Sequence, residues 1–323
     1  MKPVVPIFFS VNDAYSPFLA TAISSIKVNA SRQYTYRIHI LTDDISPANR
    51  SRLQALSGPD FQVEFFPLSS RLRTLPGVDA LQKHCFGAFA SLTIYFRLFI
   101  PALFPQYDKA IYLDADLVVP GDISRLWEED LEDKLVGAVA DYSIQKIAPF
   151  MQYIDRYVGV DHRQYVNSGV LILNCKRLRE EDLCGRFLHW AQTYALQTVA
   201  PDQDYLNALC WEGIHYLDPR WNTMPSESLP GLTNPRIIHF NLASKPWLNE
   251  HAPYEDVFWK YAALSGFEAD IRARQEQFLR DTQAVRRYKE GIRKLIAMAA
   301  RLTGKEQSFR SLIDRQIELR LCS

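Results

Sequence analysis

Strand-like and helix-like segments alternate along this sequence from its first residues, and this order limits the possible folds more than any other feature. An apolar run at 4–11 is followed by a helix-like stretch at 16–29 and by a second strand-like run at 36–42. A Ser-Pro pair at 46–47 predicts the start of another helix, and the segment at 61–68 reads as another strand. The order predicts an α/β fold, in which a mostly parallel sheet is flanked by helices and binds ligands beyond the carboxyl ends of its strands.

The alternation continues beyond residue 90. Further strands are expected at 109–116, 135–141 and 165–174, and further helices at 91–104, 177–197 and after Pro201. The helix at 91–104 is expected to be largely buried and to end near Pro101. Ser168 and Gly169 are expected to interrupt the strand at 165–174.

The chain is long enough for one large domain with an appendage. It has 323 residues, 47% of them hydrophobic, which is ample for a buried core. Its 37 acidic and 37 basic residues cancel, so we expect no nucleic-acid partner. The charge is unevenly distributed, because residues 268–323 hold 13 lysines and arginines against 8 acids. We therefore expect a main domain at 1–267 and a helical, basic tail at 268–323, hereafter the C-terminal extension.

The C-terminal extension contains an amphipathic pattern. Apolar residues recur at helical spacing at Val285, Tyr288, Ile292, Leu295, Ile296, Ala299 and Leu302. Basic residues occupy the rest of the turn, at Arg286, Arg287, Lys289, Arg293, Lys294 and Arg301. Such a helix can lie on an anionic membrane surface, and it can equally pack against the main domain or against a second copy of the chain in a homo-oligomer.

Cysteine usage and hydropathy bear on location. The chain has five cysteines, at 85, 175, 184, 210 and 322. They form no C-x-x-C pair, which is typical of a reducing compartment. The first residues form an apolar run interrupted by Pro6, without a small-residue cleavage pattern, and no window reaches the ~18 apolar residues that a spanning helix needs. We expect a cytoplasmic protein, either soluble or peripheral on the inner face of a membrane.

Two acids, Asp114 and Asp116, stand at the end of the strand expected at 109–116. In an extended chain residues i and i+2 point the same way, so both carboxylates can face one object. Two like charges that close are costly without a cation between them, and carboxylate oxygens suit Mg²⁺ or Mn²⁺. The alternative is a pair of solvated acids in a turn.

The segment 236–247 is a second apolar strand that ends in a polar loop, with His239 at its end and Lys245 six residues later. His239 is either a structural histidine or a nitrogen ligand that would make the site suit Mn²⁺. Lys245 can meet a phosphate as a point charge. The thirteen glycines form neither a dinucleotide-binding fingerprint nor a P-loop, so metal and cationic side chains would have to neutralise a bound diphosphate.

Seven motifs occur in the order and at the spacing of a known family. They are FFSVNDAY, LTIYFRL, AIYLDADLVV, GAVAD, YVNSGVLILN, PDQDYLN and IIHFNLASKPW, which together cover roughly residues 4–260. On these motifs the sequence resembles glycosyltransferase family 8, retaining enzymes that include bacterial lipopolysaccharide galactosyl- and glucosyltransferases and the glycogenins. The resemblance implies a GT-A fold with a Rossmann-like nucleotide-binding sheet. It also implies metal-dependent, retaining transfer of a hexose from UDP-galactose or UDP-glucose to a saccharide or lipid-linked acceptor, as in lipopolysaccharide biosynthesis.

The resemblance implies a role for individual residues as well. Mn²⁺, or Mg²⁺, would be held by Asp114, Asp116 and His239. The UDP-hexose would be contacted by Ser10, Val11, Asn12, Tyr15, Arg97, Asp114, Ala115, Asp141 and Lys245. The residues at the reacting sugar would be Asn167, Gln203 and Asp204. Gln203 is a poor nucleophile and Asp204 can attack or merely polarise, so we favour front-face displacement, in which the leaving phosphate oxygen helps to deprotonate the acceptor hydroxyl.

The sequence departs from the family pattern at two positions. Family members often have Asn where Ala14 stands and Gly where Leu242 stands. Ala14 loses a hydrogen bond to the donor, and Leu242 carries a Cβ where the backbone would approach the diphosphate. Both changes bear on donor affinity.

Other interpretations of the same residues are open. Asn167 can cap a turn, Arg97 can lie along a helix surface with its stem buried, and Asp202 can cap the helix after Pro201. Among functions, the alternatives are a non-catalytic nucleotide-sugar-binding protein and a glycogenin-like enzyme that glucosylates one of its own sixteen tyrosines. A phosphatase of the haloacid-dehalogenase type also begins from an apolar strand and D-x-D, but it has no place for the later N-S-G and H-x(5)-K motifs.

Overall fold

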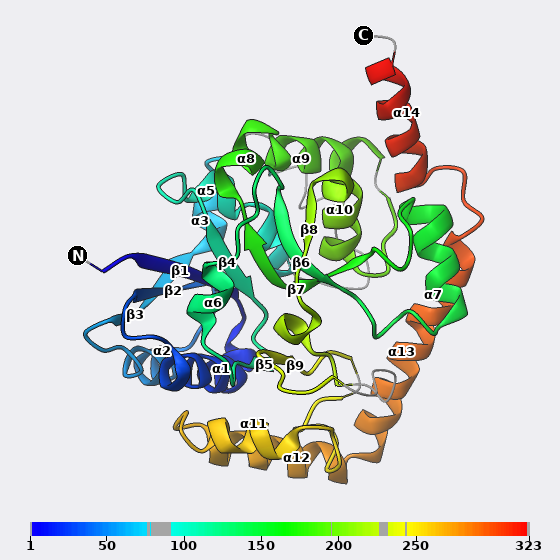
Figure 1. The fold of residues 1–323 in the computed structure, drawn as a ribbon. Coiled ribbons are helices and arrows are strands. Elements are labelled where there is room, and N and C mark those ends of the chain that lie inside the picture. The colour runs from blue at the N-terminus through cyan, green and yellow to red at the C-terminus, as the bar shows by residue number, and fades with distance from the viewer. Residues whose placement is uncertain are drawn as a thin grey trace.

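A seven-stranded sheet forms the centre of the structure, a computed structural model that describes residues 2–75, 78, 92–194, 196–225, 232–242 and 244–321. The strand order is β3-β2-β1-β4-β7-β6-β8 (Figure 1). The strands are β1 (Val4–Ser10), β2 (Thr35–Thr42), β3 (Phe61–Pro67), β4 (Ala110–Leu113), β6 (Val136–Ala140), β7 (Val166–Leu173) and β8 (Ile214–Tyr216).

One strand of this mostly parallel sheet runs against its neighbours. β1 is parallel to β2 and β4, β2 is parallel to β3, and β6 is parallel to β8, whereas β7 is antiparallel to both β4 and β6. The carboxyl ends of β1, β4 and β6 therefore lie at the same edge of the sheet as the amino-terminal residues of β7. At that edge the amide of Asp114 donates to the carbonyl of Gly169 at 2.8 Å, which joins the D-x-D segment to the N-S-G segment.

A small second sheet extends from the same edge. β5 (Leu117–Val118) pairs antiparallel with β9 (Ile238–His239), and Leu117 is opposite His239. Because β5 begins directly after Asp116, this pairing brings the histidine to the two acids although more than a hundred residues of chain separate them.

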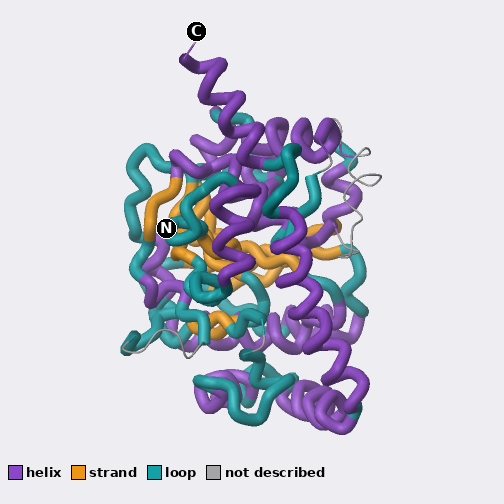
Figure 2. Tube along the Cα trace, turned by 90° about the vertical axis from the view of Figure 1, so that its right-hand side faces the viewer, coloured by secondary structure: helices purple, strands orange, loops and turns teal. Residues whose placement is uncertain are grey.

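Two hydrophobic cores cover the two faces of the sheet, and neighbouring strand residues alternate between them. Phe8 and Tyr112 belong to one core, whereas Ile7 and Ile111 belong to the other. The first core is covered by α3 (Leu68–Leu72), α5 (Ile100–Leu103), α7 (Ala148–Tyr153), α8 (Cys175–Glu180), α9 (Leu183–Tyr194) and α10 (Pro201–Cys210). The second is covered by α1 (Ser16–Asn29), α2 (Pro47–Gln54), α6 (Ile123–Trp127) and α11 (Glu255–Ala262). The strands consequently lie inside a shell of helices (Figure 2), the arrangement expected from the alternating sequence.

Short helices of other types connect these elements. The described residues include four 3₁₀ helices, at Asp13–Tyr15, Leu92–Leu98, Trp211–Gly213 and Pro219–Asn222. A single π-helical turn, Ile154–Val158, continues α7 and ends at Gly159, whose φ of 89° lies in the left-handed region that glycine adopts readily.

Three predicted elements differ from the observed ones. The helix predicted at 91–104 is a 3₁₀ helix at Leu92–Leu98 followed by α5, and Pro101 stands in the first turn of α5 instead of ending a helix. Ser91 lies outside the described residues. The helix predicted at 177–197 is divided into α8 and α9 at Asp182, which has a φ of 46°. The strand predicted to break at Ser168 and Gly169 is a single strand, β7, which pairs with β4 beyond the glycine and with β6 on both sides of it, although the β6 ladder shifts its register between Ala138 and Ala140.

The C-terminal extension consists of three helices, α12 (Glu268–Arg280), α13 (Thr282–Leu302) and α14 (Phe309–Leu321). α13 runs beside α7 (Figure 1). Ala299 and Leu302 of α13 are buried in the first core, and Leu295 and Ile296 pack against it. The apolar face of α13 was predicted to contact a membrane, the main domain or a second copy of the chain. In the structure it packs against the main domain. No helix among the described residues combines the length and the apolar character needed to cross a bilayer.

Candidate active site

The ends of four sheet strands and the start of α10 surround a pocket of about 540 Å³. β1, β4 and β6 contribute the residues that follow their carboxyl ends, and β7 contributes its first residues. The polar side chains that line the pocket include Ser10, Asn12, Tyr15, Arg97, Asp114, Asp116, Asp141, Asn167, Gln203, Asp204 and His239. Val11 and Ala115 line it as well. Lys245 is the one predicted site residue outside this lining, and its ammonium contacts Asp116.

Asp114, Asp116 and His239 form a cluster whose potential ligand atoms all lie within 4.8 Å of one another. The Nε2 atom of His239 is 3.2 Å from Asp116 Oδ1 and 3.8 Å from Asp114 Oδ2. The Nδ1 atom of His239 is 3.1 Å from Asn222 Oδ1. Because an amide oxygen only accepts, Nδ1 donates to Asn222, and this hydrogen bond turns Nε2 towards the two acids.

Lys245 and His239 keep Asp116 ionised. Burial by itself would raise the pKa of Asp116, but the Lys245 ammonium and the His239 ring lower it well below its usual range. The Lys245 ammonium also donates to the carbonyl of Phe240 at 3.0 Å. Asp116 is therefore a carboxylate at neutral pH, as a metal ligand has to be.

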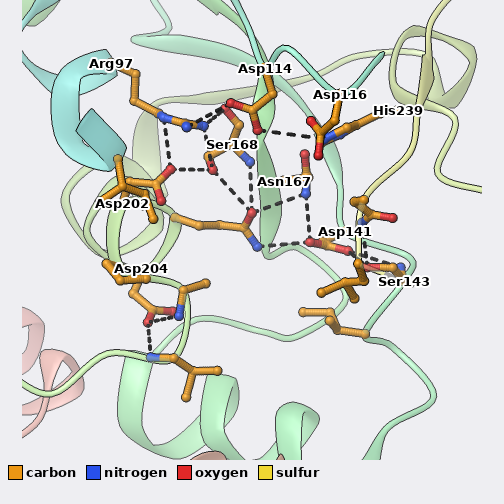
Figure 3. A pocket seen from close by; sticks show the side chains of 18 of the residues that line it. Arg97, Asp114, Asp116, Asp141, Ser143, Asn167, Ser168, Asp202, Asp204 and His239 are labelled. Atoms are coloured by element: carbon orange, nitrogen blue, oxygen red, sulfur yellow. Dashed lines mark hydrogen bonds and ion pairs between the residues drawn. The ribbon is translucent and has the colours of Figure 1, made fainter. Parts of the chain in front are cut away.

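One oxygen of Asp114 is held by neighbours and the other points towards His239. Oδ1 accepts from Arg97 Nη2 at 2.9 Å and from the Tyr112 hydroxyl at 2.9 Å. The buried Arg97 guanidinium also lies 4.3 Å above the centre of the Tyr112 ring. Burial would lower the pKa of Arg97, but Asp114 and Asp202 raise it, so the guanidinium stays charged. Figure 3 shows Arg97 and Asp202 on one side of Asp114, and Asp116 and His239 on the other.

Gly169 makes room for this convergence. A Cβ at this position would lie 2.3 Å from His239 Cε1 and 2.6 Å from Asp114 Oδ2. Both side chains are held by hydrogen bonds and have little space to withdraw. The N-S-G motif therefore needs glycine at this position because His239 and Asp114 approach its Cα closely. The position does not need the conformational freedom of glycine.

A buried ion pair joins α10 to the 3₁₀ helix at Leu92–Leu98, and both partners are hydrogen-bonded to Ser168 of β7. Asp202 Oδ2 is 3.0 Å from Arg97 Nε and accepts from the Ser168 hydroxyl at 2.7 Å. Arg97 Nη1 also donates to the carbonyl of Ser168 at 2.5 Å. The interpretation of Asp202 as a helix cap is thus wrong, because the N-cap of α10 is Ala200 and the Asp202 side chain turns to Arg97 instead. The interpretation of Arg97 as a surface residue is wrong for the same reason, since its side chain is 6% exposed.

Gln203, Asp141 and Asn167 form a polar network in the wall of the pocket. Gln203 Nε2 donates to Asp141 Oδ2 at 3.0 Å, and Asn167 Nδ2 donates to the same oxygen at 3.0 Å. The Gln203 carbonyl oxygen accepts from the Ser168 amide at 3.0 Å. Three side chains predicted from separate motifs therefore present one connected set of donors and acceptors to the pocket.

Asp204 is held differently from its neighbour Gln203. Its carboxylate is fully buried and accepts from the hydroxyls of Tyr153 at 2.8 Å and Tyr165 at 2.7 Å. It also accepts from the amides of Val199 at 3.0 Å and Ala200 at 3.1 Å. In Figure 3 Asp204 lies apart from the cluster of Asp114, Asp116 and His239. Four donors occupy the carboxylate, so its arrangement is that of a side chain that fixes the loop before α10.

The burial of Asp204 predicts a pH-dependent stability. Burial raises the pKa of Asp204 from 3.8 to about 6, against the opposing effect of the two tyrosine hydroxyls. Between pH 4 and pH 6 the folded protein binds this proton and the unfolded chain does not, so stability falls as the pH rises through that window. The shift corresponds to about 3 kcal/mol. We expect the stability advantage of the wild type over Asp204→Asn to shrink by up to this amount from pH 4 to pH 7.

Urea unfolding of both proteins across this range measures the effect. Comparison with the variant cancels the contributions of other titrating groups, which are common to the two. A difference in unfolding free energy that stays constant with pH would contradict the burial of an ionisable carboxylate at this position.

The remaining wall of the pocket is apolar. It is formed by Ile144, Phe150, Tyr153, Ile154, Val199 and Leu295. These residues come from the turn between β6 and α7, from α7, from the π-helical turn after it, from the loop before α10, and from α13 of the C-terminal extension. The pocket thus has a charged side at the strand ends and an apolar side at the helices.

Sequence reasoning missed several residues that orient the predicted ones. Asn222 fixes the ring of His239, Tyr112 and Asp202 fix Asp114 and Arg97, and Ser143 donates to Asp141 Oδ1 at 2.5 Å. Asn222 stands in no recognisable motif, and long-range contacts bring it to the site: its neighbour Thr223 bridges Ile238, and its own side chain donates to Asn167 Oδ1 at 2.9 Å. Asp202 precedes Gln203 and Ser168 follows Asn167 in the sequence. This adjacency to predicted site residues was the one available signal for them.

Comparison with known proteins agrees with the geometry. The sequence model of glycosyl transferase family 8 matches residues 6–251. General stress protein A of Bacillus subtilis is 25% identical over 284 residues, which cover 81% of this chain and 94% of that protein. Glycosyltransferase GlyA of Streptococcus pneumoniae is 30% identical over 252 residues, which cover 73% of this chain but 34% of GlyA.

Solved structures extend the agreement to the fold. The bifunctional glycosyltransferase WbbM superposes with a TM-score of 0.71 at 25% identity, over 85% of this chain and 52% of WbbM. The galactosyltransferase LgtC, solved in complex with donor and acceptor sugar analogues, superposes with a TM-score of 0.63 at 25% identity, over 80% of this chain and 95% of LgtC. The fold is the GT-A fold of these enzymes, and the chain belongs to glycosyltransferase family 8.

Proposed function

We propose that this glycosyltransferase moves a hexose, galactose or glucose, from UDP to a hydroxyl of a saccharide or lipid-linked acceptor, with retention of configuration and with the help of a divalent metal. The observation that carries the proposal is the cluster of Asp114, Asp116 and His239, which shares one pocket with the network of Gln203, Asp141 and Asn167. Such a cluster can hold a cation beside the diphosphate, and the neighbouring network can donate and accept hydrogen bonds with the hydroxyls of a sugar.

The donor set fits a divalent cation. Asn222 orients His239 so that Nε2 faces the two acids, and Arg97 occupies one oxygen of Asp114 while the other faces His239. Two carboxylates with an imidazole suit Mn²⁺ better than Mg²⁺, which prefers oxygen ligands. When bound, the cation supplies positive charge against which the departing diphosphate develops its negative charge. Lys245, already beside Asp116, adds a second cation on that side.

The other residues would bind and orient the donor. Ser10, Val11 and Asn12, at the end of β1, together with Tyr15, offer the surface for the nucleoside, and Asp141, Gln203 and Asn167 offer hydrogen bonds to the hexose hydroxyls.

We favour front-face displacement at the anomeric carbon. The acceptor hydroxyl attacks from the face that the diphosphate leaves, the carbon–oxygen bond to phosphate breaks, and the leaving phosphate oxygen takes the hydroxyl proton. The four hydrogen bonds to Asp204 support this assignment over attack by Asp204, because a carboxylate with four donors is a weak nucleophile. Gln203 would polarise the sugar from the pocket wall.

The apolar side of the pocket would receive the acceptor. Leu295 and Phe150 can pack against the apolar face of a sugar ring or a hydrophobic group attached to it. We also propose that the protein is cytoplasmic and peripheral, with the exposed basic side chains of α13 facing an anionic membrane. Because the apolar face of α13 packs inwards, this contact would be electrostatic. Equal flotation with anionic and neutral vesicles would argue against it.

Donor hydrolysis tests the function before any acceptor is known. The protein is incubated with Mn²⁺ and a panel of nucleotide sugars, and the release of nucleotide is measured beside an Asp114→Ala control. We expect slow hydrolysis of one UDP-hexose that stops in the control and on removal of the metal. UDP binding without turnover of any donor or acceptor would favour the non-catalytic alternative, and a mass increase of the protein itself would indicate self-glucosylation. Absence of UDP binding would overturn the proposal.

A further inference from the structure

Side chains of the C-terminal extension hold the two loops that flank the donor side of the pocket. The Arg274 guanidinium of α12 donates to the carbonyl of Ala14, and the Tyr288 hydroxyl of α13 donates to the carbonyl of Leu242. Gln275 of α12 donates to the carbonyl of Pro246 at 2.6 Å. Three side chains of the extension thus donate hydrogen bonds to main-chain carbonyls of the loops after β1 and after β9.

The loop after β9 needs such support. Leu242 lines the pocket with 39% of its surface exposed, and its φ is 45°, in the left-handed region that a leucine rarely adopts. A strained conformation persists only where the surroundings fix it. The loop also joins His239 to Lys245, which both contact Asp116, so a change at Leu242 would be felt at the metal cluster.

The loop after β1 is held in the same way. Ala14 follows Asn12 and precedes Tyr15, and both of these side chains line the pocket. The Arg274 guanidinium lies 6.0 Å from the ring of Phe18, the first core residue of α1, so the arginine reaches across the start of that helix. The fold therefore ties both loops to one appendage.

The extension is itself anchored, so it can serve as a support. Ala299 and Leu302 are buried at the far end of α13, and Ile271 of α12 is buried in the second core. Near the contact, the ring of Phe278 packs edge-on against Tyr288 at 6.1 Å. Burial raises the pKa of Tyr288 above its usual value, although Lys245 opposes this effect. Because its pKa is raised, the phenol remains protonated at neutral pH and can donate its hydrogen bond.

We propose that Tyr288 and Arg274 are positioning residues, through which the C-terminal extension fixes the two loops in the conformation that binds the nucleotide of the donor. The inference rests on the proposed function, because it assumes that UDP occupies this side of the pocket. The main domain alone would hold both loops loosely, and binding would then have to order them at a cost in affinity. Neither residue contacts the reacting sugar, so the effect belongs to donor binding and not to the chemical step.

Two single substitutions in the full chain test this role. Tyr288→Phe removes only the hydroxyl and keeps the ring against Phe278, and Arg274→Gln removes the donor to Ala14. Each is expected to weaken the binding of UDP, measured by calorimetry with Mn²⁺, about fivefold, the effect of one hydrogen bond. The KM for the UDP-hexose should rise by a similar factor while kcat changes less than twofold, the signature of lost uniform binding.

Arg286→Gln is the matched control, because this exposed α13 side chain pairs with Glu290 of the same helix. It should bind UDP as the wild type does. Melting temperatures of all three variants should stay close to that of the wild type. Unchanged UDP affinity in Tyr288→Phe and Arg274→Gln, or a loss that follows a fall in melting temperature, would overturn the inference. A wild type that binds no UDP would overturn the proposed function instead, so the two failures are distinguishable.

Discussion

Asp116→Asn should lower kcat/KM for sugar transfer by about 10²–10³-fold, the size expected when a charge-stabilising group is lost from a transition state. Asp116 lies between the Lys245 ammonium and His239, and an amide in its place leaves the buried lysine without its counter-ion. The variant should also need a higher Mn²⁺ concentration for half-maximal activity, because one anionic ligand has become neutral.

Activity is measured over a Mn²⁺ titration in both proteins. Asp60→Asn is the matched control, since it makes the same exchange at an exposed acid paired with Lys2 and should be neutral. Removal of the metal should abolish most of the activity of both proteins, and the Mn²⁺ concentration that restores half of the maximal activity should be higher for Asp116→Asn. Transfer within threefold of the wild type in Asp116→Asn would rule out a metal site at this cluster.

Gly169→Ala is expected to be nearly as severe although it adds a single methyl group. The new Cβ would overlap His239 and Asp114, whose side chains are fixed by Asn222 and Arg97. Either the two ligands separate or β7 shifts away from β4, and we expect a loss of activity of about 10²-fold from the misplacement. Overpacking should cost about 1–3 kcal/mol of unfolding free energy.

Gly291→Ala provides the comparison for this variant. A Cβ at Gly291, in the middle of α13, meets nothing within 4 Å, so alanine should stabilise the helix by about 0.5–1 kcal/mol and leave activity unchanged. Urea unfolding and Mn²⁺-dependent transfer are measured on both. If Gly169→Ala keeps wild-type metal dependence, the close packing around the glycine has no functional role.

The sequence allowed correct predictions wherever the signal was local. The helix at Ser16–Asn29 was predicted with both bounds and the helix at Pro47–Gln54 was predicted with its start, because apolar spacing and a Ser-Pro pair are local signals. The convergence of Asp114 and Asp116 followed from their spacing, and their meeting with His239 was suggested by the histidine at the end of a second strand and implied by the resemblance to the family. No periodicity relates residues 116 and 239, which are joined by the pairing of β5 with β9.

What the sequence did not reveal depends on partners far along the chain. A buried strand reads as the same apolar run whether it is parallel or antiparallel, so the reversed direction of β7 was not predictable, although it determines that Asn167 and Ser168 reach the site. Asp202 resembles a helix cap by position, but the buried guanidinium of Arg97 offers it a stronger partner than the first amides of α10. The apolar pattern of the C-terminal extension is equally compatible with a membrane surface and with a protein surface. The structure was needed to show that this face packs against α7.

The pairing of β5 with β9 has a consequence for biosynthesis. During translation, β1, β2 and β3 can associate as soon as they emerge, because their pairings are close in sequence. Asp114 and Asp116 can meet His239 only after β9 has been synthesised. The loops that follow β1 and β9 can be held by Arg274 and Tyr288 only after α12 and α13 have been synthesised as well. At roughly 5–20 residues per second, the ribosome needs on the order of ten to thirty seconds to supply the stretch from the acids to Tyr288. During that interval β6, β7 and β8 are still being added to the sheet, so the two acids gain His239 only after the central sheet is complete, and the loops gain the contacts of the extension last of all.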